Sequence, residues 1–470
     1  MTQPDHPEHK KLNLSWKWIA FLFLIGFAMV VGFSYIMFLQ HAKSRMFQLK
    51  KKAEKILPEI NAYFTEEEDA PGNGAAYLMG LVETPGFEKL DGDIDYKADD
   101  PAAIIKLITD WLGKNPDWIE KNAKLKEYSR FRFKRDINEG ALMLLNELAG
   151  IRHLVRVNEE ICKFLVKRKR HEEYMDLITS MIHVSDTYFE PIFIAHLVSI
   201  ALNNITNFAI YRTAGYITEP EKVNRLISLF REDIPLNERM IAANKGELIS
   251  FGYWLTDINN LANKEFKDLC FPKTDIEKII SFALYRYIET GNLLENYFTV
   301  INLSKLTYPD NKNKCEKMIT GFGKYGYILS KQLMQIFPDV FPLNIRAINH
   351  RRCTQAVLRI HLFYLENRRL PDTLEEIEYY KQNGIPVDAP YKNPLVYFKS
   401  EDPLCFRVKW IGEDQKDSGE WLKPKQNKKT GKYSHNDFGW VYVMTSHKVP
   451  LGEYILGIDY YEIESDIILE

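Results

Sequence analysis

The sequence predicts a mainly α-helical protein. It would have a single N-terminal transmembrane helix, a multi-helix, repeat-like domain and a small C-terminal α+β module with an antiparallel sheet. Three observations predict this fold class. Residues 18–40 are apolar and uncharged. From 101 to 344, apolar residues recur every three or four positions, which is the period of helices. After Gly384 the period shifts toward two, and turn-forming residues separate the segments, as they do between strands.

The stretch 18–40 predicts a transmembrane helix that follows a short N-terminal tail, residues 1–17. A hydrocarbon core about 30 Å thick takes ~20 apolar residues in a helix, and a helix satisfies its own backbone there. A cleaved signal peptide would have a shorter apolar core and small residues at its cleavage site, and Gln40-His41-Ala42 matches this poorly. We therefore expect an uncleaved signal anchor whose partner is membrane lipid.

The charges around this stretch bear on which side of the membrane the rest of the chain lies. Three lysines precede the stretch, and a larger set of cations follows it: Lys43, Arg45, Lys50, Lys51, Lys52 and Lys55. Taken alone, the positive-inside rule favours a cytoplasmic body. Large domains are translocated against such a local bias, so the opposite orientation stays open.

Composition limits the classes of partner. The formal net charge of the 470 residues is −2, which leaves no basic footprint for nucleic acid. We therefore expect no nucleic-acid partner. The five cysteines are widely spaced and form no C-x-x-C pair, so neither a disulfide framework nor a zinc site is predicted.

Two segments of different character lie between the predicted anchor and the helical domain. Residues 41–64 predict a juxtamembrane helix, basic at first and then amphipathic, which Pro58 is expected to kink. Residues 65–100 are rich in acidic residues and glycines. This composition predicts an irregular acidic linker.

Residues 101–344 predict a helical domain built of antiparallel helix pairs. Asp99-Asp100-Pro101 is typical of a helix start, and Thr218-x-x-Glu221 and Thr274-x-x-Glu277 are capping boxes that would open further helices. The apolar run 193–216 contains asparagines and a histidine. It therefore predicts a core helix and not a second membrane span.

The sequence assigns no catalytic and no cofactor-binding residue. Gly321-x-Gly323-x-x-Gly326 matches a dinucleotide-binding pattern, but that pattern needs a preceding strand, and residues 314–320 are predicted to be helical. The histidines are scattered and form no metal-binding pair. The nucleophile-elbow and P-loop patterns are absent.

The last predicted unit, residues 345–470, combines helices with strands. A helix over 345–367 is followed by a capping box, Thr373-x-x-Glu376, that would start a short helix. Segments with a period of two predict the strands of the antiparallel sheet; they are 395–398, 405–411, 440–444 and 454–456. The polar segment 413–439 predicts a long exposed loop.

The order of motifs in this unit resembles that of a known family. The motifs are Tyr364, Leu370-Pro371, Leu374, Pro386-x-Asp388, Pro394-Leu395, Tyr397, Gly412-x-Asp414-x-Lys416-Asp417-x-Gly419, Asp437 and Trp440. They resemble the C-terminal part of the major pseudopilin of type II secretion. The resemblance is closer to a broad family of uncharacterised, membrane-anchored bacterial proteins, which carry this pseudopilin-like module after a helical domain.

The resemblance implies a calcium loop, because the aspartate loop of the pseudopilin binds calcium. Asp414, Asp417 and Asp437 are the candidate metal ligands here, and calcium is the candidate cofactor. Gln415 replaces a glycine of the family, which makes the turn harder to close. The alternative is a hairpin loop whose aspartates bond their own backbone. Residues 18–40 also lack the glutamate of a pilin N-terminus, so we do not expect the chain to polymerise as a pilin.

These observations predict a membrane-anchored, non-enzymatic interaction or envelope-assembly protein with a protein partner. The resemblance implies a single-pass protein of the bacterial inner membrane whose soluble part is extracytoplasmic. Two alternatives stay open. One is an envelope hydrolase with an unrecognised site, and the other is a cytoplasm-facing helical scaffold, which the charge bias favours.

Overall fold

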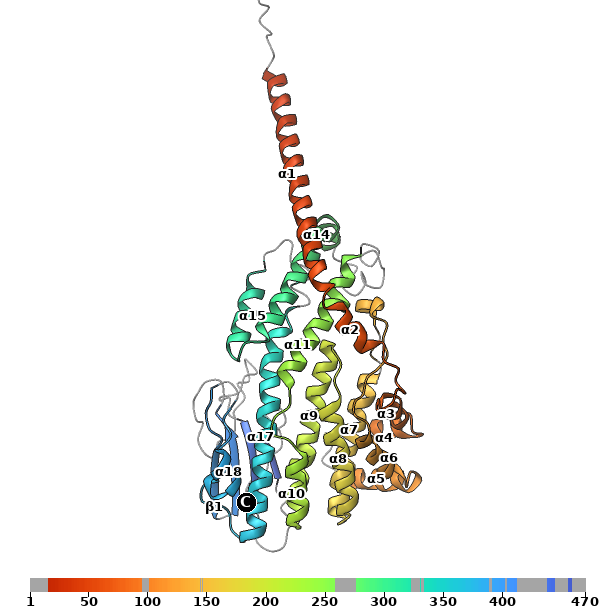
Figure 1. The fold of residues 1–470 in the computed structure, drawn as a ribbon, viewed down its shortest axis with the longest axis vertical. Coiled ribbons are helices and arrows are strands. Elements are labelled where there is room, and N and C mark those ends of the chain that lie inside the picture. Colours follow the sequence, from red (N-terminus) through yellow and green to blue (C-terminus); the bar gives the residue numbers. More distant parts are fainter. Residues whose placement is uncertain are drawn as a thin grey trace, which may run out of the picture.

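The computed structural model describes residues 16–94, 101–143, 145, 147–257, 276–322, 330, 334–388, 391–401, 404–411, 438–443 and 455–458. Within these ranges the protein is mainly helical and has an antiparallel sheet near the C-terminus, so the predicted fold class is confirmed. Figure 1 shows helix α1 projecting from one end of an elongated helical body, with the sheet in the half of the body farther from α1.

Helix α1, Trp16–Ala53, contains the predicted apolar stretch and continues unbroken beyond it. Large apolar side chains from Phe21 to Phe38 are exposed on it. In the part of the chain that the structure describes, two helical stretches are long and apolar enough to cross a membrane, Phe23–Ala53 and Phe193–Tyr216. The second is mostly buried inside the body, as predicted for a core helix. The N-terminal stretch is therefore the candidate span.

Helix α2, Leu57–Phe64, follows α1 after a short turn. Pro58 lies in the first turn of α2, where the missing amide hydrogen of proline breaks no helical hydrogen bond. The expected kink at Pro58 is thus a complete break between two helices.

The expected irregular linker over 65–100 does not hold for residues 75–93. Two short helices form there, α3 at Ala75–Val82 and α4 at Phe87–Asp93. Their apolar side chains belong to the main core: Ala75, Leu78, Leu81, Phe87 and Leu90. The many acidic residues hid this helical pattern. Short helices with one apolar face bury surface that a linker would leave in water.

Helix α5, Pro101–Lys114, begins at the predicted proline. Helix α6, Trp118–Ala123, and two 3-10 turns follow, η1 at Lys124–Glu127 and η2 at Ile137–Leu142. Trp118 is buried and stacks on the Phe87 ring with 5.6 Å between ring centroids. This aromatic contact joins α4 to α6.

Long helices packed side by side form the body (Figure 1). They are α7 (Glu147–Lys167), α8 (His171–Thr187), α9 (Phe193–Thr213), α10 (Pro220–Leu229), α11 (Leu236–Glu247), α14 (Ile276–Leu303), α15 (Asp310–Thr320) and α17 (Phe337–Asn367). Shorter turns are η3 (Ala214–Tyr216), the π-helical η4 (Leu248–Tyr253) and η5 (Trp254–Thr256). Helix α9 is central, because it contacts α7, α8, α11 and α17.

The predicted capping boxes have different outcomes. Helix α10 begins at Pro220 with Glu219 as its N-cap, so the prediction that Thr218 caps this helix is wrong. Proline at the first helical position has a suitable backbone angle and needs no hydrogen-bond acceptor, and it sets the start instead. Thr274 lies outside the described residues. The box of Thr373 and Glu376 is confirmed, with both of its bonds formed at the start of η6, Leu374–Glu376.

The boundary predicted between residues 344 and 345 falls inside helix α17. Phe337 and Phe341, near the start of α17, belong to the main core. Cys353 and Val357, farther along, belong to a second core that includes residues of the sheet. One continuous helix therefore joins the helical domain to the C-terminal module, and no linker separates them at this point.

After α18, Glu378–Asn383, the chain forms a sheet in the order β1-β2-β3-β4. Its strands are β1 (Val396–Glu401), β2 (Leu404–Trp410), β3 (Phe438–Val443) and β4 (Ile455–Ile458), all paired antiparallel. On β2, Phe406, Val408 and Trp410 alternate along the strand and lie in the second core. Trp410 donates its ring N–H to the Asn349 carbonyl at 2.8 Å, which fixes β2 against α17.

Candidate functional site

The candidate calcium ligands Asp414, Asp417 and Asp437 lie outside the described residues. Among the residues that are described, no group of three or more His, Cys, Asp or Glu side chains is arranged to hold a metal ion. The calcium loop therefore stays a prediction.

The glycine pattern at 321–326 follows a helix, as expected. Helix α15 ends at Thr320, directly before Gly321, so the strand that a dinucleotide site requires is not there. The histidines have separate partners. His196, for example, is buried and its Nε2 lies 2.9 Å from Oδ1 of Asn344. Burial lowers the pKa of His196 to about 4, so the ring is neutral at neutral pH and makes a structural contact.

The most distinctive feature of the molecule is the junction between α1 and the body. We call residues 41–53 of α1 the junction segment. Ala42, Met46, Leu49 and Ala53 of this segment are buried. The last three belong to the main core, and Ala53 has no exposed surface. Their spacing of three and four places them on one face of α1. The same helix that carries the exposed apolar stretch is therefore built into the body.

Helix α14 is the main partner of the junction segment, and α1 packs along it. A Cβ on Gly291 would lie 3.7 Å from Cβ of Met46, so the two helices are in close contact. Arg45 donates from Nη1 to Oδ1 of Asn292 at 3.1 Å and forms an ion pair with Glu295. Tyr287 lies near Lys43 and Gly291 lies near Met46, so residue numbers rise together along the two helices, which run in the same direction.

Two lysines of the junction segment lie over aromatic rings. Nζ of Lys43 is 6.0 Å from the ring centroid of Phe47 and 5.9 Å from that of Tyr287 on α14. Nζ of Lys50 is 5.2 Å from the ring centroid of Tyr253. Such cation–π contacts stabilise an exposed site by ~0.5–1 kcal/mol each.

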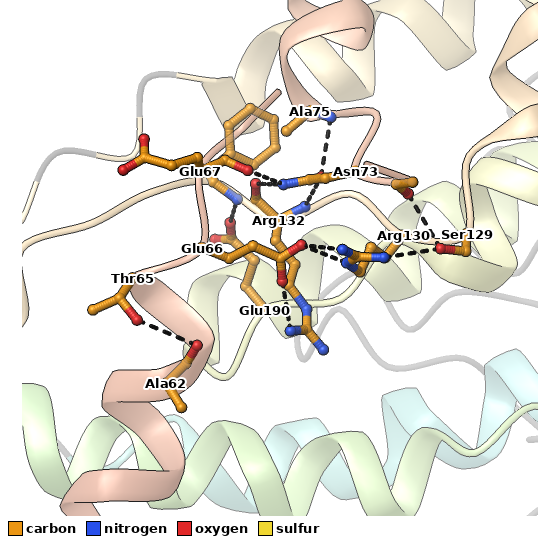
Figure 2. A network of polar contacts seen from close by, with 12 residues as sticks. Ala62, Thr65, Glu66, Glu67, Asn73, Ala75, Ser129, Arg130, Arg132 and Glu190 are labelled. Carbon is orange, nitrogen blue, oxygen red and sulfur yellow. Dashed lines mark hydrogen bonds and ion pairs between the residues drawn. The ribbon is translucent and has the colours of Figure 1, made fainter. Parts of the chain in front are cut away.

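A polar network ties the chain after α2 to a segment far along the sequence (Figure 2). Glu66 accepts from Nε of Arg130 at 2.5 Å and from Nη1 of Arg132 at 2.8 Å. These two arginines lower the pKa of Glu66, Arg130 most strongly, and the carboxylate stays ionised. Asn73 donates to the carbonyls of Glu67 and Arg132 and accepts from the Arg132 amide, so its buried amide is fully bonded.

A second network surrounds the corner between α8 and α9. Oε2 of Glu190 accepts from Arg135 through Nε at 3.0 Å and Nη2 at 2.6 Å, and Oε1 accepts the amide of Phe133 at 3.2 Å. Arg135 also pairs with Glu147. Two carboxylates thus share one guanidinium. Glu190 is 0% exposed, and this burial raises its pKa to about 7 despite the attraction of Arg135.

A third buried charge lies where α17 meets α8 and α9. Arg351, also 0% exposed, donates to Asp186 at 2.8 Å and to Oδ1 of Asn203 at 2.9 Å. Its guanidinium lies 4.1 Å from the Phe230 ring centroid. Removing one partner of a buried pair typically costs ~3–5 kcal/mol, so this group fixes how α17 sits against α8 and α9.

None of these buried charges is predicted from the sequence. A detectable signal existed in two cases. Glu190 is a lone carboxylate in the apolar stretch Tyr188–Phe193, and Arg351 lies four residues from Ala347 on the buried face of α17. Their partners are 55 and 165 residues away, and no local pattern identifies them.

The described arrangement has an exposed apolar helix that is rigidly joined to a body held by buried ion pairs. Such an arrangement can hold the surface of the body at a fixed position relative to the surroundings of the exposed part of α1. Comparisons with models of protein families, with curated proteins and with solved structures find no match to this chain.

Proposed function

We propose that this protein is a single-pass protein of the bacterial inner membrane, and that it presents a helical body and a C-terminal module to protein partners without catalysing a reaction. The observation that supports this most is the continuity of α1. The apolar stretch and the junction segment form one helix, and the junction segment is part of the core. A tether that only needed to hold the body near the membrane could be flexible.

Packing energies indicate that the junction is stable. Fully burying a side chain such as Met46 or Leu49 contributes ~1.5–3 kcal/mol. The Arg45–Glu295 pair is 40% and 51% exposed at its two side chains, so it contributes at most about 1 kcal/mol. Apolar contact with α14 therefore dominates, and it would hold the body in one orientation to the bilayer.

The fixed orientation can be tested with a flexible insertion. Six glycine and serine residues placed between Gln40 and His41 would free the body from the span while leaving the junction segment intact. We expect the protein to stay in the membrane fraction but to lose crosslinks to its neighbours from photoreactive residues on the body. The same insertion after Asn383, in an exposed turn, is the control. Crosslinks that survive the first insertion unchanged would show that orientation is irrelevant.

We place the body on the extracytoplasmic side, following the resemblance of the C-terminal module. The cations from Lys43 to Lys55 favour a second candidate, a cytoplasm-facing scaffold. Reporters fused at the C-terminus separate the two. An enzyme active only outside the cytoplasm should be active in the fusion, and a fluorescent protein that matures only in the cytoplasm should be dark. The reverse pattern would assign the scaffold.

We propose further that the pseudopilin-like module is the docking unit and that Asp414, Asp417 and Asp437 bind calcium. The test is calorimetric titration of calcium into the full-length protein in detergent, compared with Asp414→Asn. The full chain is required, because α17 contributes to both cores and a fragment starting at 345 would cut this helix. Absence of binding heat in the wild-type protein would end the calcium proposal and leave the docking proposal to the crosslinks.

A further inference from the structure

The junction segment leaves almost no space between the apolar stretch and the body. The apolar stretch ends at Gln40, and Ala42 is already buried against the body. Two residues of helix correspond to about 3 Å. If α1 spans a membrane, as proposed above, this end of the body must therefore lie in the lipid headgroup layer, which is about 5–8 Å thick on each side.

Lys43 lies at this level, and the Phe47 and Tyr287 rings lie near its ammonium. Lys43 is about 4–5 Å and Phe47 about 10 Å beyond Gln40 along the helix. Side chains on a helix lean toward its N-terminus, so both reach back toward the bilayer. Phe47 is 44% exposed. Outside the apolar stretch, it is the one large aromatic side chain among the strongly exposed apolar residues of the described part.

The charge of Lys43 is available for a ligand. Arg45, two residues farther along α1, is occupied by Glu295 and Asn292. Nζ of Lys43 instead lies 6.0 Å from the Phe47 ring centroid and 5.9 Å from the Tyr287 ring centroid, and among the described residues it forms no ion pair. A lysine with an apolar stem close to aromatic rings at a bilayer surface matches a lipid: the rings contact the glycerol region and the ammonium contacts a phosphate.

We propose that Lys43, Phe47 and Tyr287 form a binding site for the headgroup of an anionic phospholipid in the leaflet next to the body. Lys51 is also exposed on α1, eight residues along the helix and about 12 Å farther from the bilayer. This separation exceeds the Debye length of about 8 Å at physiological ionic strength. Replacing each lysine in turn therefore removes the same charge at two different distances from the bilayer.

The full-length protein is reconstituted into vesicles containing equal amounts of phosphatidylcholine and phosphatidylglycerol and then released in mild detergent. Native mass spectrometry measures the ratio of the two lipids that stay bound. We expect Lys43→Gln to lower the ratio of phosphatidylglycerol to phosphatidylcholine about fivefold, the factor expected for one lysine at an anionic surface. Lys51→Gln should change it less than about twofold, because of its depth. Lys43→Arg should keep the ratio.

Equal losses in Lys43→Gln and Lys51→Gln would overturn the site while leaving the membrane anchor in place. Wild-type protein that does not enter the vesicles would overturn the anchor and the site together. Inorganic phosphate, compared with chloride at the same ionic strength, distinguishes the two sources of phosphate. Displacement of the lipid by phosphate alone would show that the site takes the free ion, and would overturn the lipid proposal.

Discussion

Replacing Gly246 by alanine tests the close approach of α11 to the corner between α8 and α9, where Pro191 lies. Gly246 lies in α11, and a Cβ built on it would be 1.5 Å from the carbonyl oxygen of Pro191. Ordinary van der Waals contact starts at 3.4 Å, so about 2 Å of movement is required. The obstacle is backbone, and Pro191 follows Glu190, whose carboxylate is held by Arg135 and by the Phe133 amide.

The cost of Gly246→Ala has two parts. Overpacking a buried contact costs ~1–3 kcal/mol. Moving Pro191 weakens the hydrogen bonds of the neighbouring Glu190 carboxylate, and bonds to charged groups contribute ~1.5–3 kcal/mol. We therefore expect a loss of about 3–5 kcal/mol in the free energy of unfolding. For a body of this size, at about 2 °C per kcal/mol, the thermal midpoint falls by roughly 6–10 °C.

Gly80→Ala is the matched control. Gly80 also lies within a helix, α3, and a Cβ built on it has no atom within 4 Å. Here alanine should stabilise the protein by ~0.5–1 kcal/mol through the lower entropy of the unfolded chain. The assay is thermal unfolding of the full-length protein in detergent at one scan rate, followed by tryptophan fluorescence. If Gly246→Ala unfolds at the wild-type temperature, α11 does not cross the α8–α9 corner as described.

Three further predictions concern pH, a buried ion pair and a helix cap. The pKa of Glu190 is raised to about 7, so the folded protein binds its proton more tightly than the unfolded chain does. The resulting stabilisation is fully present below the ordinary carboxyl pKa and is lost as pH rises through 7. The complete loss amounts to about 3 kcal/mol of unfolding free energy. Glu190→Gln should therefore flatten the decrease in unfolding free energy between pH 5 and pH 8 measured with guanidinium; an unchanged slope would contradict the assignment. Asp186→Asn should cost about 3 kcal/mol, because it leaves the buried guanidinium of Arg351 without its carboxylate, and the double change with Arg351→Met should recover part of this loss in the same assay. Thr373→Ala should lower the unfolding free energy by ~1 kcal/mol, because it removes the cap bond from the Glu376 amide, whereas Thr373→Ser keeps the hydroxyl. Equal unfolding free energies for the alanine and serine variants would show that this cap has no effect.

Local sequence patterns correctly predicted those helices, strands and caps that are determined by residues close together in the chain. The apolar stretch within α1, the start of α5 at Pro101 and the capping box at Thr373 all appear where the sequence places them. The strands of the C-terminal sheet also follow their period of two. In each case the signal is the spacing or the chemistry of residues within about one turn or one strand, which acts before any tertiary contact forms.

Composition was misleading where tertiary packing overrides it. Acidic residues suggested a linker at 65–100, yet Leu78 and Phe87 are buried in the core. The expected domain boundary at 345 lies inside α17, because both cores take side chains from that one helix. A helix continues wherever either core can bury its apolar face, and the sequence alone does not show that two cores adjoin.

For the candidate site, the apolar helix that is long enough to span a bilayer and the cations that follow it can be predicted from the sequence. The burial of Met46 and Leu49 in the body and the pairing of Arg351 with Asp186 depend on the fold. The difference lies in the distance along the chain over which each effect acts. Propensity and hydrophobic period act over a few residues, whereas burial and ion pairing depend on which distant segments the fold brings together.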